Sequence, residues 1–224
     1  MTAQAYNALD GDSLGADKII RATTMQSLYD NPTAIAQRGS GAPWNNGIGA
    51  MTVYTSGSGN FTVPDGVYRI KARIVGGGGG GYGSSGTPTA GGNTTFSTLT
   101  ANGGAAGTAG TANSGGTASG GDINIAGQDG GTFDTSADLY YQGGGDSAMG
   151  SGGRPSGAGK GYGAGGGARN VSAGTDVTGG AGGGYCEKIF TVAPGDLIAY
   201  SVGAAGTPGL NAGAGTAGII IIEY

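Results

Sequence analysis

Glycine constrains the fold of this chain more than any other residue, since it occupies 56 of the 224 positions. Ordering a glycine costs more backbone entropy than ordering any other residue, and a glycine inside a helix costs about 1 kcal/mol relative to alanine. A helical bundle or an ordinary α/β enzyme cannot be built from this composition. Disorder is favoured by high net charge, yet the formal net charge is only −4. The chain therefore needs a fold that orders glycine.

The spacing of the glycines predicts how they are ordered. About 40 of them lie in residues 76–184, and two runs keep a period of three: Gly104, Gly107, Gly110 and Gly116, and Gly203, Gly206, Gly209, Gly215 and Gly218. Three residues per turn is the repeat of the polyproline II helix, which has no internal hydrogen bonds. With glycine facing inward, neighbouring segments can approach closely and exchange backbone hydrogen bonds. We expect a bundle of packed polyglycine-II strands, with a flexible linker as the alternative.

Residues 45–75 and 185–224 have the pattern of strands. Between residues 68 and 74, apolar and basic side chains alternate, as in a strand with one polar face. Residues 219–222 are four isoleucines, which favours a central strand covered on both faces. Because these stretches flank 76–184, the two ends of the chain must come together. The predicted fold is mainly β: an antiparallel β-sandwich-like scaffold carrying a glycine-rich insertion at 76–184.

Residues 1–44 differ in composition and form a separate N-terminal segment, followed by a glycine-rich β domain at 45–224. Residues 16–29 are predicted to form a short helix, which ends before Pro32. One face of it carries a narrow stripe, namely Ile19, Ile20, Thr23, Thr24, Ser27 and Leu28. A lone helix of this kind is not stable by itself. We expect the segment to serve in attachment or trimerisation.

The composition argues against several kinds of site. There is no histidine and only one cysteine, Cys186, so the commonest general base and metal ligand are missing and no disulfide can form within the chain. A pI of about 4.5 argues against nucleic acid. Gly159-Lys160 lacks the Ser or Thr of a phosphate loop, and the aspartates keep no calcium-repeat register. We expect no cofactor and no metal. No apolar run approaches the roughly 20 residues of a membrane span, and we expect synthesis in a cytoplasm without a secretory signal.

A pair of carboxylates that cleaves a glycan is the one enzymatic alternative with candidate residues. These are Asp134, Asp138, Asp146, Asp176 and Glu187. None of them lies in a sequence context that predicts a raised pKa, and loop carboxylates commonly form turns. We therefore expect no catalytic residues and no enzymatic activity.

Islands of other residues between the glycine blocks are the candidate binding sites. Residues 128–142 (QDGGTFDTSADLYYQ) bring aromatic and acidic side chains together, and smaller islands follow. Tyr and Arg are favoured on recognition surfaces because they offer large contact areas. The alternative is that the aromatic residues only close the end of the bundle. The candidate receptor-binding residues are Phe133, Asp134, Asp138, Tyr140, Tyr141, Lys160, Tyr162 and Arg169.

The order of the motifs resembles bacteriophage tail-fibre and receptor-binding proteins with a C-terminal glycine-rich domain. The resemblance is carried by residues 30–43, 61–67, 74–79, 185–195, 200–203 and 218–224. It implies a virion protein at a tail fibre or baseplate, a homotrimer, that contacts other tail proteins and a host receptor of protein or glycan. Some phage adhesins of this kind display variable loops on packed polyglycine-II strands.

The expected function is attachment to the bacterial host surface from the virion. The alternatives are a structural tail-tip or baseplate component without receptor contact and, less favoured, a capsule depolymerase. An ice-binding polyglycine-II protein is disfavoured by the strands and the helix. The identity of the receptor and of the host does not follow from the sequence.

Overall fold

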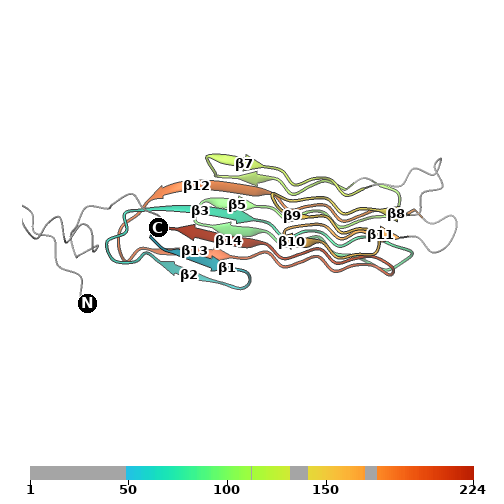
Figure 1. Ribbon diagram of the computed structural model, residues 1–224, viewed down its shortest axis with the longest axis horizontal. Coiled ribbons are helices and arrows are strands. Elements are labelled where there is room, and N and C mark those ends of the chain that lie inside the picture. Colours follow the sequence, from blue (N-terminus) through green and yellow to red (C-terminus); the bar gives the residue numbers. More distant parts are fainter. Residues whose placement is uncertain (1–48, 112, 132–140, 170–175) are drawn as a thin grey trace, which may run out of the picture.

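The computed structural model describes residues 49–111, 113–131, 141–169 and 176–224. Within them the chain is mainly β, and no helix occurs there. The predicted helix at 16–29 and most of the island at 128–142 lie outside the described residues. The molecule is long, with broad strands at one end and narrow glycine-rich segments running side by side to the other (Figure 1).

Two five-stranded antiparallel sheets form the broad end. Sheet I has the order β1-β14-β3-β12-β7, with bounds Met51–Tyr54, Ile219–Glu223, Arg69–Val75, Tyr185–Thr191 and Ile123–Ile125. Sheet II has the order β2-β13-β4-β5-β6, with bounds Ser58–Thr62, Leu197–Ser201, Thr94–Phe96, Leu99–Ala101 and Ala118–Ser119. Two smaller pairs complete the strands: β9 (Met149–Ser151) with β10 (Lys160–Tyr162), and β8 (Tyr141–Gln142) with β11 (Ala168–Arg169).

The strands predicted on either side of 76–184 pair with one another. β3 lies between β12 and β14, so the centre of sheet I joins parts of the chain far apart in sequence. The alternation in β3 is confirmed, since Ile70, Ala72 and Ile74 are buried. β14 is an inner strand as predicted, but Ile221 on its outer face is only half-buried, so the expected cover on both faces is incomplete.

The hydrophobic core lies between the two sheets. Sheet I contributes Ile70, Ile74 and Ile220, and sheet II contributes Phe96 and Leu99. The last two belong to the region predicted as an insertion, so the boundary at residue 76 is not a structural boundary for the core. Residues 94–101 form a tight hairpin of aromatic and β-branched residues, turning at Ser97 with a φ of 52°. The dense glycines on either side obscured this short strand signal.

The glycine-rich segments are hydrogen-bonded to one another side by side, and we call them together the glycine bundle. They are residues 76–83, 89–93, 102–107, 113–117, 126–131, 143–147, 152–154, 157–159, 163–168, 176–184, 202–209 and 211–218. Segments 76–83, 163–168 and 176–184 are buried along almost their whole length. These buried segments are rich in glycine, because a backbone that is enclosed by other backbones leaves no room for side chains.

Segment 76–82 shows how the glycine bundle is built. Its amides donate in threefold rotation: those of 76, 79 and 82 to segment 178–184, those of 77 and 80 to segment 89–92, and those of 78 and 81 to segment 213–216. Its carbonyls accept from three further segments, 104–107, 206–209 and 166. Each segment therefore bonds in several directions around its axis, unlike a strand in a sheet, which bonds on two sides.

The period of three in buried glycines holds within a segment and is interrupted at its turn. Gly203 and Gly206 are buried, whereas the residues between them are exposed. Gly104 and Gly107 are also buried, with two half-buried alanines between them, whereas Gly110 lies in a turn with a φ of +66°. The longer registers through Gly116 and Gly218 predicted from sequence therefore span separate segments.

Candidate functional site

The end of the glycine bundle farthest from the sheets gathers turns that are distant in sequence, and we call it the loop end. Its described residues are Tyr82–Ser85, Thr108–Thr111, Arg154–Gly157, Arg169, Asp176–Thr178 and Leu210–Ala212. Isolated backbone bridges join Tyr82 to Thr178 and Ser85 to Leu210. β8 and β11 lie at this end in Figure 1. The turns therefore form one continuous surface.

Asn211 joins three of these turns. Its backbone has a φ of 61°, a left-handed conformation that Asn tolerates better than most residues. Its side-chain amide donates to Ser84 Oγ at 2.7 Å. Its carbonyl accepts from the Arg169 amide at 3.1 Å and from Ser156 Oγ at 3.2 Å. One residue thus holds the geometry of this side of the loop end.

Thr178 fixes the turn at Thr108 from a fully buried position. Its Oγ1 accepts from the Thr108 amide at 2.7 Å and donates to the Thr108 carbonyl at 2.6 Å. Both bonds are partly buried, with the exposed Thr108 above and the buried Thr178 below. The side chain of Thr178 therefore supports the loop end from beneath.

Replacing Thr178 by valine is expected to lower the free energy of unfolding by about 1–3 kcal/mol, because the Thr108 amide and carbonyl lose their buried partner. Chemical denaturation measures the change. The matched control is Thr111→Val, since Thr111 is exposed and its hydroxyl makes one long bond of 3.4 Å. Equal losses in the two variants would contradict the buried role of Thr178.

The structure separates the candidate binding residues into two places. Phe133, Asp134, Asp138 and Tyr140 lie outside the described residues. Tyr141 and Arg169 are cross-strand neighbours at the loop end, and Arg169 is exposed.

Lys160 and Tyr162 do not join that group. They lie in β10, whose hairpin with β9 is nearer the sheets than the loop end (Figure 1). The next residue, Gly163, packs against Val75 at the end of β3. Lys160 and Tyr162 are therefore apart from Arg169 in space, because the chain turns back between Arg154 and Gly157.

Two loop-end residues were missed by the sequence analysis. Leu210 is 61% exposed, and Asn211 is the structural centre of its turn. The sequence Pro208-Gly209-Leu210-Asn211 carries turn chemistry that could have drawn attention to both. The prediction for this stretch covered only its period-three glycines.

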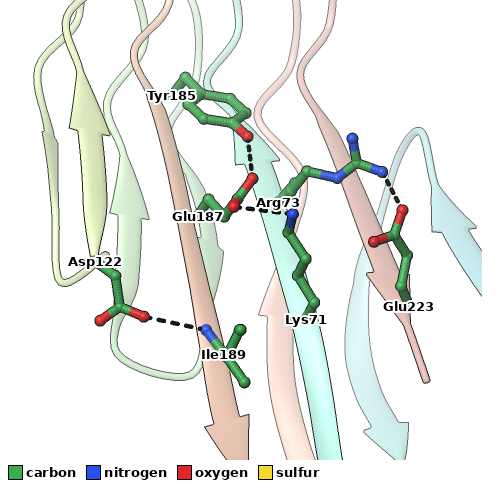
Figure 2. Close-up of polar contacts among 7 residues, drawn as sticks. All are labelled: Lys71, Arg73, Asp122, Tyr185, Glu187, Ile189 and Glu223. Atoms are coloured by element: carbon green, nitrogen blue, oxygen red, sulfur yellow. Dashed lines mark hydrogen bonds and ion pairs between the residues drawn. The ribbon is translucent and has the colours of Figure 1, made fainter. Parts of the chain in front are cut away.

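The outer face of sheet I holds the other prominent polar cluster (Figure 2). Lys71 Nζ lies 2.9 Å from Glu187 Oε1, and Arg73 pairs with Glu223. The Tyr185 hydroxyl donates to Glu187 at 2.7 Å. Burial opposes ionisation of Glu187, but the Tyr185 hydrogen bond and Lys71 outweigh it and lower its pKa. A general acid needs the opposite shift, so this carboxylate suits a structural ion pair.

Tyr185 predicts a pH dependence of stability at the alkaline end. Burial, and then the hydrogen bond to Glu187, raise its pKa from 10.0 to about 12. The stabilising contribution of the protonated hydroxyl is complete below pH 10 and is lost as the pH rises towards about 12. We expect Tyr185→Phe to flatten the stability profile in this window, as measured by denaturation at a series of pH values. Tyr68→Phe, at an exposed ring, is the control and should leave the slope unchanged.

Among the residues that the structure describes, no group of three or more Cys, Asp or Glu side chains is arranged to hold a metal ion. In the same residues, no helix is long and apolar enough to cross a membrane. No family model and no curated protein sequence matches the chain.

Proposed function

We propose that this chain is a bacteriophage tail-fibre or receptor-binding protein that attaches the virion to the bacterial surface through the loop end of the glycine bundle. The observation that carries the proposal is that the sheet end and the loop end lie at opposite ends of the molecule. The amides of Gly49 and Ala50 both donate to the Tyr224 carbonyl, at 3.1 and 2.8 Å, so the N-terminal segment leaves from the sheet end. The turns of the loop end lie at the opposite end. Attachment to the virion and contact with a host would then use different ends.

We infer that the segments of the glycine bundle are polyglycine-II strands, carried as an insertion on a β-sandwich. The threefold rotation of hydrogen bonds around segment 76–82 supports this. Because glycine has no side chain, the backbones of neighbouring segments can pack directly against one another. This packing gives a narrow, stiff stem. Backbone dihedrals near φ −75° and ψ +145°, measured in solution by nuclear magnetic resonance, are expected for the central segments.

The chemistry of the loop end suits recognition. Its exposed side chains include Arg154, Arg169 and Leu210, a mixture of cationic and apolar contacts. Arg is enriched among residues that dominate binding energy. Thr178 and Asn211 hold the turns in place. The other residues of the turns can therefore vary while the stem is kept. In a homotrimer on the fibre axis, three such ends would bind a cell surface with avidity.

The test is binding of the labelled full-length protein to a panel of bacterial strains. Leu210→Asp changes the loop end, and the matched control Leu197→Asp changes an equally exposed leucine, 67% against 61%, on sheet II. We expect the first variant to lose binding at least about tenfold, as for an interface residue worth 1.4 kcal/mol, and the second to bind as the parent does.

Other outcomes separate the alternatives. Binding to no strain, with no inhibition of phage adsorption, would favour a structural tail component without receptor contact. Release of oligosaccharide from capsule would favour a depolymerase. Binding that survives Leu210→Asp and also deletion of residues 132–140, which spares the bundle segment 126–131 and β8, would move the site away from the loop end.

A further inference from the structure

The outer faces of the two sheets differ in chemistry. On sheet II, the side chains pointing away from the core are Ser58, Asn60, Thr62, Thr95, Thr100, Ser119, Leu197, Ala199 and Ser201. This polar face is what a solvated antiparallel sheet normally shows. On sheet I, the outer face includes Met51, Val53, Ile123, Ile125 and Ile189, each between 42% and 59% exposed. Sheet I therefore presents a group of large aliphatic side chains to its surroundings, whereas the outer face of sheet II presents one, Leu197.

The aliphatic side chains flank a charged strip. Lys71, Arg73, Glu187 and Glu223 form ion pairs within the chain along the middle of the face (Figure 2). Met51 and Val53 lie on β1 at one edge, and the isoleucines lie on β7 and β12 at the other. Because the charges are already paired, they need no external counter-charge. An exposed aliphatic face of this kind marks an interaction surface.

The described chain begins beside this face. Gly49 and Ala50 are hydrogen-bonded to Tyr224, and Met51 is the first residue with a side chain on the outer face. Forty-eight residues precede Gly49. They include the stripe of Ile19, Ile20 and Leu28, for which the sequence offers no partner within its own segment. The chain thus supplies an uncovered face and an apolar segment that starts from its edge.

We propose that the N-terminal segment packs across the outer face of sheet I of its own chain, with the stripe of residues 16–29 against the aliphatic side chains. The proposal is independent of whether the loop end binds a host. The dimensions fit: a helix of these 14 residues would be about 21 Å long. Five strands spaced about 4.8 Å apart span about 19 Å.

The connection is long enough, and tethering favours the same chain over another copy. Residues 30–48 can extend over about 60 Å, more than the width of the sheet. A segment joined to its target by a short connection meets it at an effective concentration of about a millimolar. A second copy that is not held beside it in an assembly would compete at a far lower concentration. The occupant of this face is therefore its own N-terminal segment.

Chemical cross-linking of the full chain tests the proposal. The single natural cysteine, Cys186, is buried, and burial raises the pKa of its thiol to about 11, so it does not compete for the reagent. The test variant carries Ile20→Cys with Ile189→Cys on sheet I. The control carries Ile20→Cys with Leu197→Cys on sheet II. A short bismaleimide reagent is added, and products are mapped by mass spectrometry.

We expect the Ile20–Ile189 pair to cross-link within a monomer at least about tenfold more than the control pair, because only the first pair is held together. Equal yields would overturn the proposal, as would cross-links found only between chains, which would assign the face to another copy. A second measurement uses Ile19→Ser, Ile20→Ser and Leu28→Ser together. Faster hydrogen exchange in β7 and β12 is expected, and unchanged exchange would count against the proposal.

Discussion

Replacing Gly78 by alanine is expected to prevent the glycine bundle from forming. A Cβ atom on Gly78 would lie closer than 3.0 Å, a distance real Cβ atoms essentially never show, to the carbonyl oxygen and carbon of Ala164. Both are backbone atoms of a buried segment, so neither can move away as a flexible side chain would. We expect a loss of at least about 3 kcal/mol in the free energy of unfolding, seen as loss of cooperative unfolding or of soluble protein.

Two adjacent glycines at the edge of the bundle give a matched control. A Cβ atom on Gly143 would have its nearest neighbour at 3.7 Å, an ordinary van der Waals contact. A Cβ atom on Gly144 would overlap the Gly165 carbonyl. We expect Gly143→Ala to change stability by no more than about 0.5 kcal/mol, as at other surface positions, and Gly144→Ala to destabilise strongly. If all three alanine variants unfolded alike, the close packing of the segments would be refuted.

Replacing Phe96 by alanine is the second change expected to have a large effect. Phe96 is fully buried, and its ring centroid lies 6.3 Å from that of Phe61 and 5.9 Å from that of Phe190. Its removal leaves a cavity between the two sheets and is expected to cost about 3–5 kcal/mol. Calorimetry or denaturant unfolding measures the loss.

The control for Phe96→Ala is Leu197→Ala, at a side chain that is 67% exposed and should be nearly neutral. Phe96 also tests whether the sheets and the bundle fold together, because the hairpin of β4 and β5 is continuous with glycine segments on both sides. A single transition for sheets and bundle is expected in the parent protein. A Phe96→Ala variant that lost the sheets but kept an intact bundle would show that the two parts fold separately.

Much of sheet I could be predicted from sequence. The alternation through Ile70, Ala72 and Ile74 identifies β3, and the isoleucines at 219–222 identify β14 as an inner strand. Three of the five strands of sheet II could not be predicted, because β4, β5 and β6 are two or three residues long. A period of two needs more residues than that to be visible.

The candidate site was predicted less well than the fold. Arg169 and Tyr141 do meet at the loop end, but Lys160 and Tyr162 lie on another hairpin. Composition says which side chains suit recognition and says nothing about which turns face the same way. Asn211 was missed because its role depends on Ser84, Ser156 and Arg169, which are brought to it by three separate turns.

The amino-acid sequence alone establishes that glycine builds this protein, that its segments repeat every three residues, and that strands at the two flanks must meet. These are local properties, set by backbone freedom and by side-chain alternation. Whether a glycine tolerates a side chain depends on the segments that surround it. Gly78 has no room for a Cβ atom, whereas Gly143 does. The loop end and the aliphatic face of sheet I also depend on the tertiary structure. Such surfaces arise from contacts between residues far apart in the chain, and no local pattern encodes them.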